Sequence, residues 1–145
     1  MGRKIRVTVQ ALVKKGQNLL VYTSYDKSKK KKFYRPIGGG VDFGETGAEA
    51  ALREFFEESG LQICNPQSLG FLENIFTLDN VKGHELVQVF LCEFSDSKNY
   101  QRKRFPLNEG KQKLQDATWV SIKTLSNKGA RFYPKGIKNL IRALG

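Results

Sequence analysis

Three glutamates stand close together in the sequence at a spacing that suits the binding of a divalent cation. Glu54, Glu57 and Glu58 lie at i, i+3 and i+4, so a helix would hold their carboxylates within one arc of its surface. Like charges at this spacing destabilise an isolated helix by about 0.2–0.5 kcal/mol per pair. Mg²⁺ binds carboxylate oxygens and keeps other positions for water and substrate phosphates. The triplet predicts a metal site, with an ordinary solvated acidic helix face as the alternative.

The residues next to the triplet favour the metal site. Gly38, Gly39 and Gly40 follow an expected strand, and without side chains they let the backbone approach the acidic helix face. A backbone carbonyl would then be a further ligand. Arg53 lies beside the acidic cluster, where it can pair with Glu57 at i+4 or hold Glu54 in place.

Capping signals define the helix that carries these carboxylates. Thr46 followed by Glu49 is a capping box, and Gly60 suits the left-handed position that ends a helix. We therefore expect a helix over 47–59. At about 100° per residue, one side of this helix gathers the residues expected to face the core, opposite the carboxylates: Ala48, Leu52, Phe55, Phe56 and Ser59.

The segment 39–61 resembles a Nudix box, whose pattern is G-x5-E-x7-R-E-U-x-E-E-x-G-U with U apolar. All nine specified positions are matched, by Gly39, Glu45, Arg53, Glu54, Phe55, Glu57, Glu58, Gly60 and Leu61. The resemblance implies an α/β fold, the Nudix-type α/β/α sandwich with a mixed β-sheet, and a single Nudix hydrolase domain over residues 1–145.

The same resemblance implies a hydrolase that uses Mg²⁺ or Mn²⁺ to cleave a diphosphate joined to a further group, by attack of water at phosphorus. Glu57 and Glu58 would be the principal metal ligands, and Glu54 a ligand or the base that deprotonates water. The Gly38 carbonyl would complete the metal site. Arg53 would orient Glu54, and Glu45 would steady the junction between loop and helix.

Some members of the family place another glutamate outside the box. Glu109 is the first candidate for that role, Glu85 the second, and neither residue the third alternative. His84, the only histidine, would contact phosphate, act as an acid or base, or lie on the surface.

Substrate choice depends on residues outside the box. Residues that would bind the substrate, chiefly by stacking on a base, are Tyr34, Arg35, Phe76, Phe132 and Tyr133. Pro134 is followed by Lys135 and not by an asparagine that would read a purine edge, which disfavours 8-oxo-dGTP. Nucleoside triphosphates or modified nucleotides come first among the small-molecule substrates, then nucleotide sugars, ADP-ribose and dinucleoside polyphosphates.

Charge and composition fit this interpretation. The chain of 145 residues carries a net charge of +11, yet six acids and one base lie between Asp42 and Glu58. A positive field around an acidic patch would attract an anionic ligand to a metal site. The basic segment 26–32 is either a solvated loop or a surface for phosphate, and it makes an RNA 5′ end an alternative substrate. A binding module without turnover is the competing class, disfavoured because every box carboxylate is present.

The remaining features bound the class of protein. No apolar run approaches the roughly 20 residues of a membrane span, and no export signal is visible. Cys64 and Cys92 are expected to be reduced thiols in the core of a cytoplasmic protein, a monomer or a homodimer. The expected elements are a hairpin of strands 5–13 and 19–24, strands at 33–37, 69–78, 85–94 and 117–122, a loop over 95–115, and a helix over 134–144. Strand 85–94 is apolar on both faces and is expected to be central.

Overall fold

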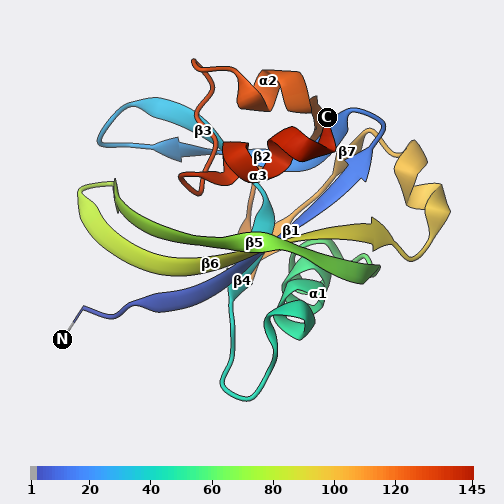
Figure 1. Ribbon diagram of the computed structural model, residues 1–145, viewed down its shortest axis with the longest axis horizontal. Helices are drawn as coiled ribbons and strands as arrows, with labels where there is room; N and C mark the ends of the chain where they lie inside the picture. The colour runs from blue at the N-terminus through green and yellow to red at the C-terminus, as the bar shows by residue number, and fades with distance from the viewer. Residues whose placement is uncertain (1–2) are drawn as a thin grey trace.

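The computed structural model describes residues 3–145 (Figure 1). The longer elements are β1 (Arg6–Lys15), β2 (Asn18–Asp26), β3 (Lys31–Arg35), β4 (Ile37–Gly40), α1 (Gly47–Ser59), β5 (Ile63–Leu78), β6 (Val81–Phe94) and β10 (Ala117–Ser121). The shorter ones are η1 (Ser97–Gln101), β7 (Arg104–Phe105), β8 (Asn108–Glu109), β9 (Gln112–Lys113), α2 (Ile122–Ser126), α3 (Ile137–Ile141) and η2 (Arg142–Leu144).

The main sheet is mixed, as the sequence predicted. Its strand order is β5-β6-β1-β2-β10-β7, with β4 paired to β1 and β3 paired to β2. β1 and β6 run parallel, and the other pairs are antiparallel. The predicted hairpin of β1 and β2 is paired only beside its turn, at Lys14↔Leu19 and Lys15↔Asn18. Beyond that point the strands separate, because β1 pairs with β4 and β6 while β2 pairs with β3 and β10.

Helices cover both sides of this sheet, with α1 below it and α2 and α3 above it in Figure 1. Alternate residues of β1 serve the two layers: Val9 and Val13 pack with Phe55 of α1, while Leu12 packs with Ile137 and Ile141 of α3. Strand β6 is divided in the same way, since Phe90, Cys92 and Phe94 join the layer under α1 and Val87 and Val89 join the other. The prediction that strand 85–94 is central is confirmed.

The capping signals of α1 act as predicted, and the helix has the expected bounds. Thr46 Oγ1 accepts a hydrogen bond from the Glu49 backbone N–H (3.1 Å), and the Glu49 carboxylate accepts one from the Thr46 N–H (2.9 Å). Gly60 has φ 74° and ends the helix.

The rotation of α1 differs from the prediction. Ala50, Ala51, Phe55 and Glu58 are its buried residues, whereas Phe56 is 50% exposed. Counting apolar side chains placed Phe56 on the core face. The helix lies instead against the glycine strand β4 and against β1, and this close approach favours small alanines at the contact. Glu58 is therefore turned inward.

The C-terminal part is more broken than the sequence suggested. Ser121 ends β10 and caps α2, a helix that was not predicted. The predicted helix over 134–144 begins only at Ile137, because Gly136 has φ 93°, and it continues as the 3₁₀ helix η2. The predicted loop over 95–115 contains η1 and the short strands β7, β8 and β9.

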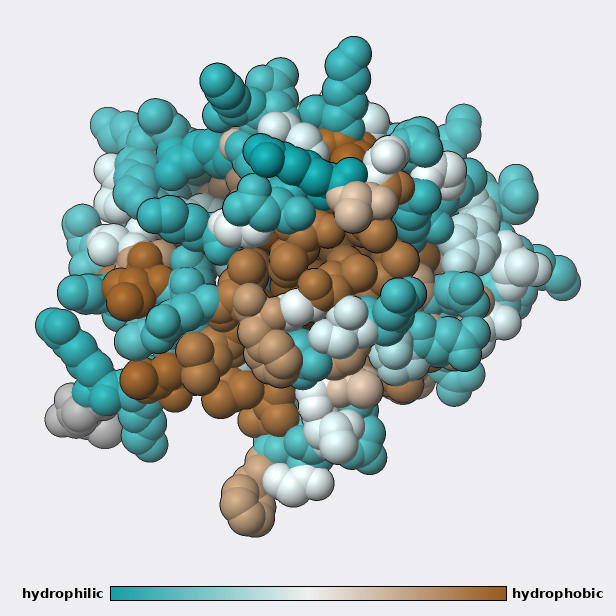
Figure 2. All heavy atoms as spheres, in the orientation of Figure 1, coloured by the Kyte–Doolittle hydropathy of each residue, from teal (hydrophilic) through white to brown (hydrophobic). Residues whose placement is uncertain are grey.

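The cysteines, the helix lengths and the apolar surface complete the description. Cys64 and Cys92 are both free thiols, Cys92 buried and Cys64 partly so. Among residues 3–145, no helix has the length and apolar character needed to cross a membrane. Figure 2 shows apolar side chains gathered across the middle of the face viewed, over β5 and β6. The exposed apolar residues of these two strands are Phe71, Ile75, Val81 and Leu86.

Candidate active site between helix α1 and strand β4

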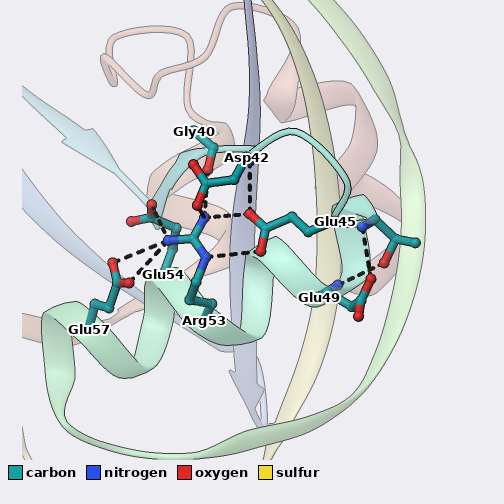
Figure 3. Close-up of polar contacts among 8 residues, drawn as sticks. Gly40, Asp42, Glu45, Glu49, Arg53, Glu54 and Glu57 are labelled. Carbon is teal, nitrogen blue, oxygen red and sulfur yellow. Dashed lines mark hydrogen bonds and ion pairs between the residues drawn. The ribbon is translucent and has the colours of Figure 1, made fainter.

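Arg53 is the centre of an ion-pair network on α1 (Figure 3). Its Nη1 donates to Glu54 at 3.0 Å and to Glu57 at 3.2 Å, so both pairings that the sequence suggested are present. The other edge of its guanidinium contacts Glu45, and Nη2 lies 3.5 Å from Asp42 and donates to the Gly40 carbonyl at 2.9 Å. These carboxylates, Glu45 first, raise the pKa of Arg53. The guanidinium of Arg53 thus holds the carboxylates of Glu45, Glu54 and Glu57 in place.

Glu45 fastens the loop between β4 and α1. Its carboxylate accepts hydrogen bonds from Arg53 Nε at 3.0 Å and from the Asp42 backbone N–H at 2.9 Å. These bonds, chiefly those from Arg53, lower the pKa of Glu45 to about 2, so it is ionised throughout the physiological range. This is the steadying position that the resemblance implied for Glu45.

The glycines of β4 form a cradle for Glu54. A Cβ on Gly39 would lie 2.3 Å from the carboxyl carbon of Glu54, and one on Gly38 would lie 2.1 Å from the Val9 carbonyl oxygen. Any side chain here would displace one of these groups, so the close approach needs glycine. Burial raises the pKa of Glu54, although Arg53 opposes that shift.

Glu58 is the least satisfied charged group of the site. It is 4% exposed, and its Oε1 has no hydrogen-bond partner among the described residues, 3–145. Burial, and then the negative charges of Glu54 and Glu109, raise the pKa of the Glu58 carboxyl to about 8. An unpartnered buried carboxylate is costly unless a cation meets it.

The buried Glu58 oxygen and the backbone of β4 next to Glu54 suit a divalent cation. The atoms available there are carboxylate and carbonyl oxygens, which are the ligands that Mg²⁺ binds. Within residues 3–145, no three His, Cys, Asp or Glu side chains are already gathered in a metal-binding arrangement. Arg53 Nη1 donates to Oε1 of Glu54 and to both carboxylate oxygens of Glu57, so Glu54 keeps Oε2 for a cation while Glu57 must turn partly away from Arg53 to become a ligand.

A cavity of about 330 Å³, here called the central pocket, lies next to this acidic cluster. Its lining residues are Arg6, Gln10, Phe33, Arg35, Asn74, Phe76, Leu78, Glu85, Glu109, Tyr133 and Pro134. The pocket adjoins the box at two points. The Gln10 side chain lies beside Gly38, and the charges of Glu109 and Arg35 act on Glu58 in opposite directions.

Several residues predicted to bind substrate or to assist catalysis line the central pocket, and others do not. Arg35, Tyr133 and both candidate outer glutamates are part of it, with Glu85 ion-paired to Arg6 at 3.4 Å. Tyr34 lines a different cavity, because successive residues of β3 point to opposite faces.

Two further candidates lie outside the central pocket. Phe132 is buried in the core layer under α3. His84 contacts Glu73 at 2.9 Å and is absent from the lining of the pocket within the described chain.

Among the pocket residues that sequence reasoning missed are two buried amides, Gln10 and Asn74. They are 8% and 3% exposed, and Gln10 Oε1 and Asn74 Oδ1 have no hydrogen-bond partner among residues 3–145. Each is an amide inside a strand rich in apolar residues, Gln10 in IRVTVQALV and Asn74 in LENIF. An isolated amide in such a strand was the available signal, since buried amides need partners.

Comparison with known proteins places this site in a family. The family model of the NUDIX domain matches residues 2–140. Similar solved structures include a NUDIX hydrolase from Nitrosomonas europaea, 20% identical with a TM-score of 0.66, covering 95% of this chain and 86% of that one. A MutT protein from Methanosarcina mazei Go1 is 19% identical with a TM-score of 0.65, covering 99% and 94%. An ADP-ribose pyrophosphatase from Streptococcus suis is 12% identical with a TM-score of 0.56, covering 90% and 81%. At these identities the structures share the fold with this chain.

Proposed function

The chain belongs to the NUDIX family, a family of hydrolases of phosphorus-containing anhydrides, and from this premise we propose a metal-dependent pyrophosphohydrolase. Its substrate is a nucleoside diphosphate joined to a further group, and its cofactor is Mg²⁺ or Mn²⁺. The observation that carries the proposal is the buried, unpartnered carboxylate of Glu58 beside Glu54 and the glycine strand. The chain carries a net charge of +11, yet this cluster of carboxylates lies next to the central pocket, where a cation would neutralise it.

The residues that would hold the cation are Glu57, Glu58 and the carbonyl of Gly38, joined by Glu54 where it acts as a ligand and not as the base. A divalent ion bound there supplies neutralisation of the diphosphate oxygens and a lower pKa for attacking water. The Nη1 of Arg53 donates to Glu54 and Glu57 and so keeps both carboxylates beside the proposed metal site.

Glu54 is the proposed base. Its Oε1 accepts the hydrogen bond from Arg53, which leaves Oε2 to receive the proton of a water molecule. The burial that raises the pKa of Glu54 makes its carboxylate a better proton acceptor near neutral pH. Glu109 is the proposed glutamate outside the box, supported by its place in the central pocket and its electrostatic effect on Glu58.

The central pocket is the proposed site for the nucleoside. Phe33 and Tyr133 meet edge to face with centroids 4.7 Å apart, and Phe76 meets Tyr133 at 6.4 Å. Such rings offer faces and edges to a base. The unpartnered amides of Gln10 and Asn74 would bind its polar edge, and Arg35 a phosphate. Nucleoside triphosphates or modified nucleotides are the first small-molecule candidates.

A substrate screen tests this function. The purified protein is incubated with nucleoside triphosphates, nucleotide sugars, ADP-ribose, dinucleoside polyphosphates and 5′-triphosphate RNA, with Mg²⁺ and Mn²⁺ tested separately and all products resolved. We expect release of a nucleoside monophosphate or its 5′-linked equivalent, abolished by a chelator. Binding without turnover for every compound would contradict the enzyme and favour a sensor.

A matched pair of variants links the activity to the acidic cluster. Glu57→Gln removes one negative charge from the cluster and is expected to lower kcat at least about 10²-fold, because charge stabilisation of this kind is worth that much. The fold should be intact or more stable, since repulsion between glutamates decreases. Glu49→Gln on the same helix keeps a capping side chain and should keep the activity. Full turnover by Glu57→Gln would contradict the assignment of the metal site.

A further inference from the structure

A second, strongly basic cavity of about 830 Å³ lies beside the central pocket, and we call it the basic groove. Its cationic lining residues are Lys29, Lys82, Arg131, Lys135, Lys138 and Arg142, and no described acidic residue lines it. They come from the β2–β3 hairpin, β6, the loop before α3, α3 itself and η2. The tips of the β2–β3 and β5–β6 hairpins lie side by side here (Figure 1), joined by a hydrogen bond from the Lys27 N–H to Asp79 at 2.6 Å.

Four of these six cationic side chains have no partner in the part of the chain that the structure describes. Lys29 forms an ion pair with Asp26 at 3.7 Å and donates to the Thr77 carbonyl at 3.1 Å, and Lys138 donates to the carbonyls of Asn127 and Ala130. The remaining cations have side chains that make no hydrogen bond or ion pair with any residue in the range 3–145: Lys82, Arg131, Lys135 and Arg142. Four unpaired cations around one hollow repel one another, and a bound polyanion relieves that repulsion.

The basic groove is continuous with the central pocket. Asn74, Phe76 and Tyr133 line both cavities, and the rings of Phe76 and Tyr133 meet edge to face between them. A ligand that leaves the central pocket over these rings enters the groove directly. Aromatic rings that alternate with a basic channel are the pattern of surfaces that bind single-stranded nucleic acid.

We propose that the basic groove binds the phosphodiester backbone of a single-stranded RNA whose 5′ polyphosphate end enters the central pocket. This inference rests on the proposed function and identifies its substrate class. The first base would stack on the rings of the central pocket while the following phosphates meet the cations of the groove. Hydrolysis adds one water across one phosphoanhydride bond, which leaves a 5′-monophosphate chain and inorganic pyrophosphate. Inorganic polyphosphate would use the cations but would leave the aromatic rings without a partner.

The test measures binding separately from turnover. A fluorescent 10-nucleotide RNA with a 5′ triphosphate is titrated with the protein in the presence of a chelator, and anisotropy reports the Kd. Lys82→Glu combined with Arg131→Glu should weaken binding about tenfold or more and flatten its salt dependence, because two phosphate contacts are lost. Lys98→Glu combined with Lys103→Glu makes the same change of charge on the distant η1–β7 segment and should change the Kd less than about twofold.

The single variant Lys82→Glu, at an exposed position, provides the same test if the double variant does not fold. With metal restored, the ratio of kcat/KM for triphosphate RNA to that for the matching nucleoside triphosphate should fall in the groove variants. Loss of RNA binding in the groove variants supports the groove even if no compound is hydrolysed, in which case only the proposed function fails. Equal binding by both double variants, or equal competition by inorganic polyphosphate, would overturn the proposal.

Discussion

At the scale of single residues, Glu58 is a deeply buried ionisable carboxyl, and it makes the stability of the protein depend on pH. Its pKa is raised to about 8, so the folded protein binds a proton that the unfolded chain releases near its ordinary pKa. Between these two pKa values the free energy of unfolding of the metal-free protein must fall as the pH rises.

We therefore predict that the Tm of the chelated protein decreases from pH 5 to pH 8. Glu58→Gln cannot ionise, so this variant should lose most of that slope and melt roughly 3–8 °C above the wild type at pH 8. Thermal unfolding followed by circular dichroism with a chelator checks the prediction. Parallel Tm curves for the two proteins across this window would show that Glu58 is not protonated in the folded state.

Asn74 gives a second prediction at this scale, because its amide lies in the central pocket with Oδ1 unpartnered. Asn74→Leu has similar volume and removes a desolvation penalty of about 1–3 kcal/mol. The variant should be as stable as the wild type or more so, but its KM for the substrate should rise about tenfold with a smaller change in kcat. Steady-state kinetics and a thermal melt measure both effects. An unchanged KM would exclude Asn74 from substrate recognition.

At the scale of elements, the glycine strand β4 determines how α1 carries its carboxylates. Gly39 has no positive φ, so alanine fits its backbone, but the added Cβ would lie 2.3 Å from the Glu54 carboxyl carbon. We predict that Gly39→Ala lowers kcat/KM about 10²-fold, since an ångström of misplacement has an effect of that size. The Tm should change by only a few degrees, because the displaced group is a flexible side chain.

Gly129→Ala is the control for this prediction, since a Cβ there meets nothing within 4 Å. It should keep both the activity and the Tm of the wild type. Activity in Gly39→Ala equal to that of Gly129→Ala would mean that Glu54 does not need its cradle.

Helix α1 and strand β4 also show which parts of the fold and of the site could be predicted from the sequence. The bounds of α1 could be predicted because Thr46, Glu49 and Gly60 act on neighbouring backbone groups. The rotation of α1 could not, because it depends on contact with a glycine strand whose place in the sheet is set by distant pairing. The box residues were identified by type and spacing. Gln10 and Asn74 belong to different strands, and only the folded sheet brings them to one pocket.

At the scale of the whole molecule, charge is segregated. Acidic residues are concentrated on α1 and the loop before it, while the chain as a whole carries +11 and its basic groove opens beside the central pocket. This field attracts anions over a distance of about 10 Å at 0.1 M salt.

Ionic strength should therefore affect capture of the substrate more than the chemical step. Raising NaCl from about 50 mM to about 300 mM at saturating Mg²⁺ is expected to raise the KM about 3- to 10-fold with little change in kcat. Initial-rate measurements over a salt series check this. A constant KM would mean that contacts inside the pocket alone determine capture.

The parallel pairing of β1 with β6 joins residues 6–13 to residues 85–92. During synthesis β1 is made long before its partner strand β6, because all the elements from β2 to β5 lie between them in the sequence. The layer under α3 closes later still, when Ile137 and Ile141 arrive. Such long-range pairing slows folding and keeps apolar strands exposed in the nascent chain. The native topology therefore forms only after the segment that carries Ile137 and Ile141 has been made, and β1 stays without its partner strand for most of the synthesis of the domain.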